Sequence, residues 1–332
     1  MSNLSGNYSF IKITSVTCIP VGVIGILTNF FLLVILSTSK SLRDPSYRII
    51  ANVIACDCIS SIQFFVVFLG PHLLRNSTFN TCRIYCKFLI YSLYSTYNAS
   101  ALSLTAVSLY RYRLVIKASQ IRFRKFELRK INRLLAIIWA ASFVFAIPMI
   151  FFSEGNNITT GNCDIGYIPN YSYLTFIYFL CVTMVTYVTP LIIMVCNYTR
   201  LIKQLKNYVI PGDNRISNIN RRHDNIIRML LAVTSAFMLF NCPLFISISF
   251  MASSAKTYYL LRRDSLILYY ICLLALPLAV FVSIINPILY ITFDKNISKE
   301  VKQRFTFELV DSMRTQSTPA RPKPRVVFIQ SS

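Results

Sequence analysis

The sequence predicts an all-α membrane protein: a seven-transmembrane helix bundle followed by a short amphipathic juxtamembrane eighth helix. Three observations predict this fold. The chain of 332 residues is 55% hydrophobic and has a mean hydropathy of +0.55, which is far more apolar than a soluble chain needs. The apolar residues gather in runs long enough to cross a bilayer. The charged residues, with a formal net charge of +22, fall mostly between these runs.

Each run exceeds the roughly 20 apolar residues that a bilayer core requires. The seven runs lie near 15–38, 47–71, 84–114, 132–152, 172–200, 226–251 and 266–292. The third and fifth are longer than a perpendicular helix needs, which predicts tilt or a protruding end. The stretch before the first run has no basic start and no small-residue cleavage site, so we expect the first run itself to act as the targeting signal.

The basic residues indicate the orientation. Lysines and arginines crowd the connections after runs one, three and five and the segment after run seven. The other side carries few basic residues, namely Lys12, Arg75, Arg83, Lys87, Lys256, Arg262 and Arg263. The richer side is expected to be cytoplasmic. We therefore expect a multi-pass protein of the cell membrane with an extracellular N-terminus and a cytoplasmic C-terminus. Basic residues spread in this way do not indicate a nucleic-acid partner.

Glycosylation sequons agree with this orientation. Five N-x-S/T triplets fall on the expected outer side, at Asn3, Asn7, Asn76, Asn157 and Asn170. Three more, at Asn98, Asn197 and Asn296, lie within a run or on the inner side and are not expected to carry glycan. The chain then divides into an extracellular segment 1–14, a membrane domain 15–307 that includes the amphipathic helix, and a cytoplasmic tail 308–332 expected to be disordered.

The ten cysteines predict one disulfide and no metal centre. Cys86 lies at the outer end of the third run, and Cys163 lies in the outer loop before the fifth. Both face an oxidising compartment, where a disulfide between them would persist. Cys82 remains an alternative partner for Cys163. The chain contains only two histidines, and neither metal-ligand spacing nor a nucleophile–base pair is visible, so an enzyme is not indicated.

Each apolar run carries residues that together form a recognisable pattern. These are Asn29; Asn52 and Asp57 in "NVIACD"; Cys86 and Arg111; Trp139 and Pro148; Pro190 and Tyr198; Phe237 and Pro243; and "NPILY" at 286–290. With these residues in this order, the chain resembles a rhodopsin-like (class A) G-protein-coupled receptor over nearly its full length.

The resemblance implies a role for the arginine that ends the third run. Arg111 would meet the C-terminal helix of a G protein when the sixth span moves outward. The resemblance implies an activation set of Arg111, Tyr112, Tyr198, Asn286, Pro287 and Tyr290. Two acids that usually restrain this arginine are replaced, one by Tyr110 and one by His223, with Asp224 beside it. The alternative is that Arg111 only reaches toward the lipid headgroups.

Asp57 is the only acid within any apolar run, and an intramembrane carboxylate is costly unless it has a function. The resemblance implies a sodium and water site that includes Asn29 and Ser283, with Asp57, Ser100 and Asn286 as candidate ligands. The alternative is a hydrogen-bonded polar cluster that only packs helices. No cofactor is expected other than this allosteric ion.

The resemblance also implies a ligand pocket that is apolar, rich in hydroxyls and free of deep charge. Its expected lining is Leu93, Tyr94, Tyr97, Thr183, Thr186, Asn241, Leu244, Phe245, Ile248, Cys272 and Leu276. Leu93 replaces the aspartate of amine receptors, Val280 replaces the lysine that carries retinal, and Asn241 replaces a tryptophan of the sixth span. Some of these residues could instead only pack helices. The basic outer rim favours a ligand with an acidic end.

The leading hypothesis is a plasma-membrane receptor for an extracellular ligand, with a peptide favoured, that signals through a heterotrimeric G protein. Arrestin and membrane lipids are further expected partners. One alternative is a chemosensory receptor for small odorant-like or lipid ligands. Another is a non-signalling scavenger of the same fold, which the replaced acid at Tyr110 favours. A transporter would show broken spans with paired charges or internal repeats, and the sequence shows neither.

Overall fold

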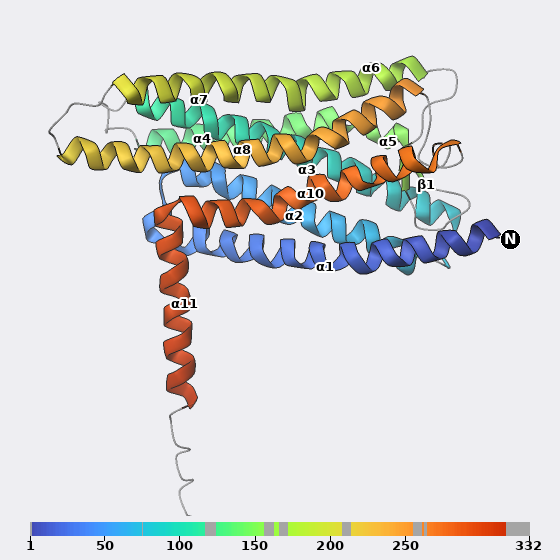
Figure 1. Cartoon of the computed structure of the whole chain (residues 1–332), viewed down its shortest axis with the longest axis horizontal. Helices are drawn as coiled ribbons and strands as arrows, with labels where there is room; N and C mark the ends of the chain where they lie inside the picture. Colours follow the sequence, from blue (N-terminus) through green and yellow to red (C-terminus); the bar gives the residue numbers. More distant parts are fainter. Residues whose placement is uncertain are drawn as a thin grey trace, which may run out of the picture.

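The computed structural model describes residues 2–74, 76–116, 124–155, 163–165, 172–207, 214–254, 261 and 264–316. Its long helices lie side by side along one axis, and the last helix leaves the bundle crosswise (Figure 1). The N-terminus and strand β1 lie at one end of the bundle, and α11 begins at the other (Figure 1). The chain therefore crosses the bundle lengthwise an odd number of times.

The elements follow the predicted runs in order. They are α1 (Ser2–Thr38), η1 (Lys40–Leu42), α2 (Pro45–Leu73), α3 (Phe79–Ile116), α4 (Arg124–Ala146), α5 (Met149–Phe152), β1 (Ser153–Gly155), β2 (Cys163–Ile165), α6 (Ser172–Thr183), η2 (Met184–Val188), α7 (Thr189–Asn207), α8 (Asn214–Ser254), α10 (Leu266–Phe293) and α11 (Lys295–Gln316). Within the described ranges, six helical stretches are long and apolar enough to cross a membrane: Cys18–Thr38, Pro45–Gly70, Leu128–Phe152, Tyr173–Lys203, Arg228–Ser254 and Leu266–Phe293.

Helix α3 corresponds to the third predicted run, but its composition is more polar than that of the other spans. Its buried polar side chains are Ser95, Thr96, Asn98, Ser100, Ser103, Thr105 and Ser108. The helix contacts α2, α4, α5, α7, η2 and both strands, so protein rather than lipid surrounds much of it. Several of these hydroxyls donate to a carbonyl of their own helix, as Ser95 Oγ does to Tyr91 O at 2.8 Å. A central helix can therefore be polar and still span the membrane.

Span five consists of α6, η2 and α7, and its middle is a single π-helical turn at Met184–Val188. Pro190 follows two residues later. A proline has no N–H to donate to the carbonyl four residues before it, which is that of Thr186, and its ring crowds that carbonyl. A π-turn relieves this conflict by adding one residue to the turn.

Helices α1 and α2 approach closely because two glycines of α1 face α2. A Cβ on Gly25 would lie 2.5 Å from Ser61 Oγ, and one on Gly22 would lie 3.1 Å from Phe65 Cβ. Such distances leave no room for even a methyl group at Gly25. Small residues of this kind allow transmembrane helices to pack through their backbones.

The two ends of the chain differ from the predicted boundaries. Helix α1 already begins at Ser2, so residues 2–14 continue the helix of the first span. Helix α11 continues to Gln316, past the predicted boundary at 307, so residues 308–316 are not disordered as expected. Residues 2–19 and 295–316 contain no proline. Every residue there keeps the backbone N–H that a helix needs, so the helix can continue past the predicted boundary.

A short hairpin at the N-terminal end of the bundle was not predicted. Strands β1 and β2 pair antiparallel, with Glu154 opposite Asp164 and Gly155 opposite Cys163. The hairpin lies over α3, which it contacts through both strands. It carries Cys163 to the end of α3 that bears Cys86.

Candidate functional site

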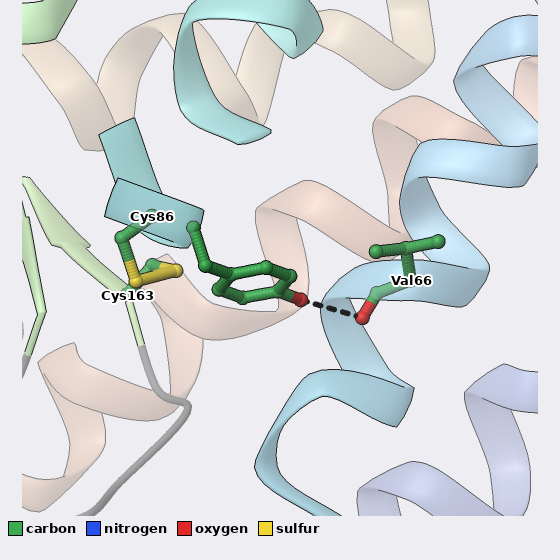
Figure 2. Close-up of a disulfide and its surroundings, with 4 residues drawn as sticks. Val66, Cys86 and Cys163 are labelled. Atoms are coloured by element: carbon green, nitrogen blue, oxygen red, sulfur yellow. Dashed lines mark hydrogen bonds between the residues drawn. A yellow bond between two sulfur atoms is a disulfide. The ribbon is translucent and has the colours of Figure 1, made fainter. Parts of the chain in front are cut away.

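The disulfide joins the loop between α5 and α6 to the end of α3. Cys86 and Cys163 are bonded with a Cα–Cα distance of 5.2 Å, and Figure 2 shows the bond where β2 passes the end of α3. Cys82, the alternative partner, is a buried free thiol. Next to the disulfide, Tyr85 donates a hydrogen bond of 2.8 Å to Val66 O on α2. The disulfide thus fixes the loop that carries β2 to this end of α3.

A buried polar cluster joins α1, α2 and α10 near the middle of the bundle. Asp57 is 5% exposed, and Asn286 Nδ2 donates to its Oδ2 at 2.8 Å. Asn29 Nδ2 donates to Gly25 O at 2.8 Å and to Ser283 O at 2.7 Å. The Oδ1 atoms of Asn29 and Asn286 are buried and accept no hydrogen bond from any described residue. Ser100 on α3 is also buried.

This oxygen set suits a monovalent cation better than a divalent one. Within the described part of the chain, no group of three or more His, Cys, Asp or Glu residues could hold a metal ion. One carboxylate with neutral oxygens offers a single full negative charge, whereas sites for divalent ions usually combine several carboxylates. The unpaired Oδ1 atoms of Asn29 and Asn286 fit such a cation, or a water, because a buried acceptor without a partner is costly.

A second polar link joins α2, α3 and α4. Trp139 Nε1 donates to Asn52 Oδ1 at 3.0 Å, and Asn52 Nδ2 donates to Ser103 Oγ at 2.8 Å. The only tryptophan of the chain is therefore bonded to the "NVIACD" segment that the sequence singled out. Both polar ends of the Asn52 amide are satisfied within the bundle, which fixes the position of α4 against α2 and α3.

The predicted pocket residues fall into two groups: some pack in a buried cluster that contains aromatic rings, and others hydrogen-bond to the backbone of their own span. Ile248 and Cys272 belong to one buried cluster, against which Tyr94 and Leu244 pack. Phe245 contacts Tyr97 at a ring-centroid distance of 5.6 Å. Thr183 and Thr186 donate their hydroxyls to Phe179 O and Val182 O of their own span, and Leu93 and Leu276 are partly buried.

Tyr97 is the centre of this region. Its ring stacks on Phe237 at 5.6 Å, and its buried hydroxyl has no hydrogen-bond partner among the described residues. Asn241, which replaces the tryptophan of the family pattern, is 1% exposed. Its Nδ2 donates to Phe237 O at 2.7 Å, and its Oδ1 is buried without a partner in the described part of the chain. Two buried polar atoms are therefore available here to a ligand or a water.

Two aromatic residues of span five were not predicted from the sequence. Tyr187, in the π-helical turn, contacts Phe245 at 4.8 Å and donates to Met238 O on α8 at 3.0 Å. Phe179 contacts Tyr94 at 6.2 Å. The π-turn shifts which residues of span five face the bundle, and regular 3.6-residue spacing does not predict that shift. Pro190 was the one signal that could have indicated it.

At the other end of the bundle lies Arg111, the first residue of the predicted activation set. The Nε and Nη2 atoms of Arg111 are buried and have no hydrogen-bond partner among the described residues. Arg111 interacts electrostatically with the hydroxyls of Tyr47 and Tyr110 and with the carboxylates of Asp294 and Asp44. It also interacts electrostatically with Tyr198, so groups from several helices act on the arginine.

The remaining activation residues are buried or partly buried in the bundle. Tyr198 Oη lies 3.2 Å from Thr234 Oγ1 on α8. Tyr290 is 1% exposed and Asn286 is fully buried, Pro287 is buried with them, and Tyr112 is partly buried. The structure therefore brings Arg111, Tyr198, Asn286, Pro287 and Tyr290 to the interior of the bundle.

One carboxylate that acts on Arg111 was not among the predicted residues. Asp294, at the junction of α10 and α11, is 2% exposed. Its Oδ1 accepts from the backbone N–H groups of Asn296 at 2.9 Å and Ile297 at 3.2 Å, which caps α11. Tyr47 donates to its Oδ2 at 3.1 Å, and Asn296 Nδ2 donates to Tyr47 Oη at 2.8 Å. An acid followed by a basic helix was the sequence signal for this cap.

Some predicted residues lie outside the described part of the chain, or their side chains do. These are Asn3, Asn7, Asn157 and Asn170 of the sequons, Lys12, Arg75, Lys256, Arg262 and Arg263 of the rim, and His223 with Asp224. Asn76 is exposed. The discounted Asn98 and Asn197 are buried in the bundle.

Comparison with known proteins identifies the class. A family model described as 7 transmembrane receptor (rhodopsin family) matches residues 28–290, which is most of the chain, so the chain belongs to this family of receptors. Prokineticin receptor 2 of Homo sapiens is 23% identical over 309 residues, 88% of this chain and 76% of that receptor.

Other relatives are similar over shorter stretches. The GQ-coupled rhodopsin of Mizuhopecten yessoensis is 28% identical over 241 residues, 66% of this chain and 46% of that protein. The substance-P receptor of Aquarana catesbeiana is 24% identical over 239 residues, 68% of this chain and 56% of that receptor. The chain thus spans about half the length of these two relatives. With six apolar spans and α3, it is a multi-pass membrane receptor, and this family does not consist of enzymes.

Proposed function

We propose that the chain is a cell-surface receptor that binds an extracellular peptide and activates a heterotrimeric G protein. The observation that carries this proposal is Arg111 at the basic end of the bundle, whose buried Nε and Nη2 atoms have no hydrogen-bond partner in the described part of the chain. A buried N–H group without an acceptor is costly, and an incoming acceptor, such as a carbonyl at a helix C-terminus, would satisfy it.

The choice of a peptide rests on the relatives and on the site. The prokineticin and substance-P receptors are among the similar proteins. Leu93 and Val280 occupy the positions where an amine receptor and a retinal-binding opsin would carry their charged groups, which disfavours both ligands despite the likeness to a rhodopsin. The Tyr97 hydroxyl and Asn241 Oδ1, which have no partner among the residues that the structure describes, offer polar contacts of the kind that a peptide backbone makes.

The proposed orientation follows the charges. The end of the bundle with α11 would face the cytoplasm and the end with β1 the exterior. Arrestin would share the cytoplasmic face with the G protein. The buried oxygens of Asp57, Ser100 and Asn286 would hold a sodium ion that stabilises the resting receptor.

The decisive experiment is a screen of peptide ligands against cells that carry the chain at the surface, with G-protein dissociation as the readout. A matched Arg111→Ala variant should bind the active peptide and release no G protein. If a peptide binds and is internalised while neither protein activates any G protein, the non-signalling scavenger replaces the proposal. Tyr110, in place of the usual acid, favours that second function. Activation by small apolar molecules alone would favour a chemosensory receptor.

A further inference from the structure

Helix α8 contains a proline, Pro243, inside its length. Pro243 has no N–H to donate to the carbonyl of Leu239, four residues before it, and its ring crowds that carbonyl. A helix bends most readily at such a turn, because one of its backbone hydrogen bonds is missing. The half of α8 before Pro243 runs toward the end of the bundle where α11 begins (Figure 1). Pro243 therefore divides α8 into two halves whose mutual angle can change.

Tyr187, in the π-helical turn of span five, contacts α8 on both sides of this proline. Its hydroxyl donates a hydrogen bond of 3.0 Å to Met238 O, in the half before the proline. Its ring centroid lies 4.8 Å from that of Phe245, in the half after the proline. The same hydroxyl interacts with the thiol of Cys242, the residue next to the proline. A single side chain of span five thus contacts both halves of α8.

The turn before Pro243 carries two carbonyls that accept hydrogen bonds from side chains. Phe237 O accepts from Asn241 Nδ2 of the same helix at 2.7 Å, and Met238 O accepts from Tyr187. Of these two bonds, the one from Tyr187 joins α8 to a different span. Met238 is only 7% exposed, so water does not readily replace the tyrosine hydroxyl once the bond is lost.

Tyr187 is also linked to the predicted ligand pocket. Phe245 contacts both Tyr187 and Tyr97, with ring-centroid distances of 4.8 Å and 5.6 Å. The hydroxyls of Tyr97 and Tyr187 interact electrostatically. A ligand that moves Tyr97 or Phe245 therefore acts on Tyr187 through direct contacts.

We propose that Tyr187 is a positioning residue that holds the first half of α8, before Pro243, against span five through its hydrogen bond to Met238 O. While this bond is made, the first half of α8 stays close to the bundle. When a ligand displaces Phe245 and the bond breaks, the first half moves away and opens the end of the bundle that holds Arg111. This inference deepens the proposed function and rests on it, since the opening is what admits the G protein.

The test measures the position of α8 in the purified full chain, with neither ligand nor G protein present. Nitroxide labels replace two exposed arginines, Arg133 on α4 and Arg228 on α8. Genetically encoded amino acids carry the labels, so the ten cysteines stay in place. Pulsed electron paramagnetic resonance then gives the distribution of distances between the labels. Tyr187→Phe keeps the ring and removes the hydroxyl. It should raise the population with the longer distance roughly two- to tenfold, the factor that one hydrogen bond contributes.

Tyr178→Phe is the matched control. Tyr178, also in span five, donates a hydrogen bond of 3.0 Å to Phe145 O on α4, so its loss removes the same kind of bond to a helix other than α8. Both variants should lower the melting temperature by a similar amount, whereas only Tyr187→Phe should shift the distances. Equal distances in Tyr187→Phe and the parent, or an equal shift in Tyr178→Phe, would overturn the proposal.

Ligand-free G-protein dissociation separates this inference from the proposed function. A rise in Tyr187→Phe without a rise in Tyr178→Phe supports both. A shift in the label distances with no G-protein dissociation from any variant supports the role of Tyr187 and overturns the signalling function. Signalling with unchanged label distances overturns the role of Tyr187 alone.

Discussion

Replacing Tyr110 by aspartate is expected to lower signalling in the absence of ligand. Tyr110 is partly buried against the main core and precedes Arg111, whose Nε and Nη2 lack hydrogen-bond partners among the described residues. A carboxylate beside the guanidinium would form a charge-assisted hydrogen bond worth about 1.5–3 kcal/mol. Because 1.4 kcal/mol is tenfold in an equilibrium, the active fraction should fall about ten- to hundredfold.

The opposite change at Asp294 provides the control. Asp294→Asn keeps an oxygen for the N–H groups of Asn296 and Ile297 but removes a charge that acts on Arg111. It should raise ligand-free signalling, and the double variant should fall between the two single ones. The assay is ligand-free G-protein dissociation at matched surface amounts. If Tyr110→Asp signals as much as the parent, or more, the loss of an acid restraint at Tyr110 is not what sets basal activity.

Three further predictions concern stability and ion binding. Cys163→Ser removes the disulfide to Cys86, which closes a loop with a sequence separation of 77, and should lower the free energy of unfolding by at most about 4.5 kcal/mol through chain entropy. The melting temperature should fall, and a reducing agent should not lower it further. An unchanged melting temperature would mean that the loop is held without the disulfide. Sodium should raise the melting temperature of the purified chain more than potassium does, and Asp57→Asn should remove this difference. A difference that persists in the variant argues against a sodium site at Asp57. Gly25→Ala places a methyl against Ser61 and should lower the free energy of unfolding by about 1–3 kcal/mol. The double variant Gly25→Ala/Ser61→Ala should recover part of this loss. No loss in the single variant would mean that α1 can move away from α2 freely.

Much of the fold could be predicted because a membrane restricts what the backbone can do. Every spanning segment must satisfy its own N–H and C=O groups, so a long apolar run such as 266–292 has few alternatives to a helix. The predicted run and α10 agree within one residue. The ends of α1 and α11 could not be predicted in this way, because outside the apolar core water also satisfies the backbone and hydropathy no longer marks the boundary.

The site residues could be predicted where a sequence motif marks a single residue. They could not be predicted where the packing of helices determines which side chains meet. Asp57 was singled out as the only acid within an apolar run, and the family resemblance placed Asn286 at the same site, where the structure shows a hydrogen bond between them. The contact between Tyr47 and Asp294 depends on how α11 turns away from α10, which sequence spacing does not determine. Likewise Tyr187 faces the bundle because of the π-turn, so a pocket lining based on regular helical spacing omits it.

The polarity of α3 has a consequence for how the protein enters the membrane. An isolated helix with so many serines, threonines and an asparagine gains less from leaving the translocation channel for lipid than its neighbours do, because partition follows the summed transfer cost of its side chains. Some of its polar groups gain partners only when other helices are present, as Ser103 does from Asn52 of α2 and Ser108 from Asn197 of α7. Integration of the central helix therefore depends on helices made both before and after it, and substitutions in α2 or α4 that remove these partners should appear first as failed insertion during synthesis.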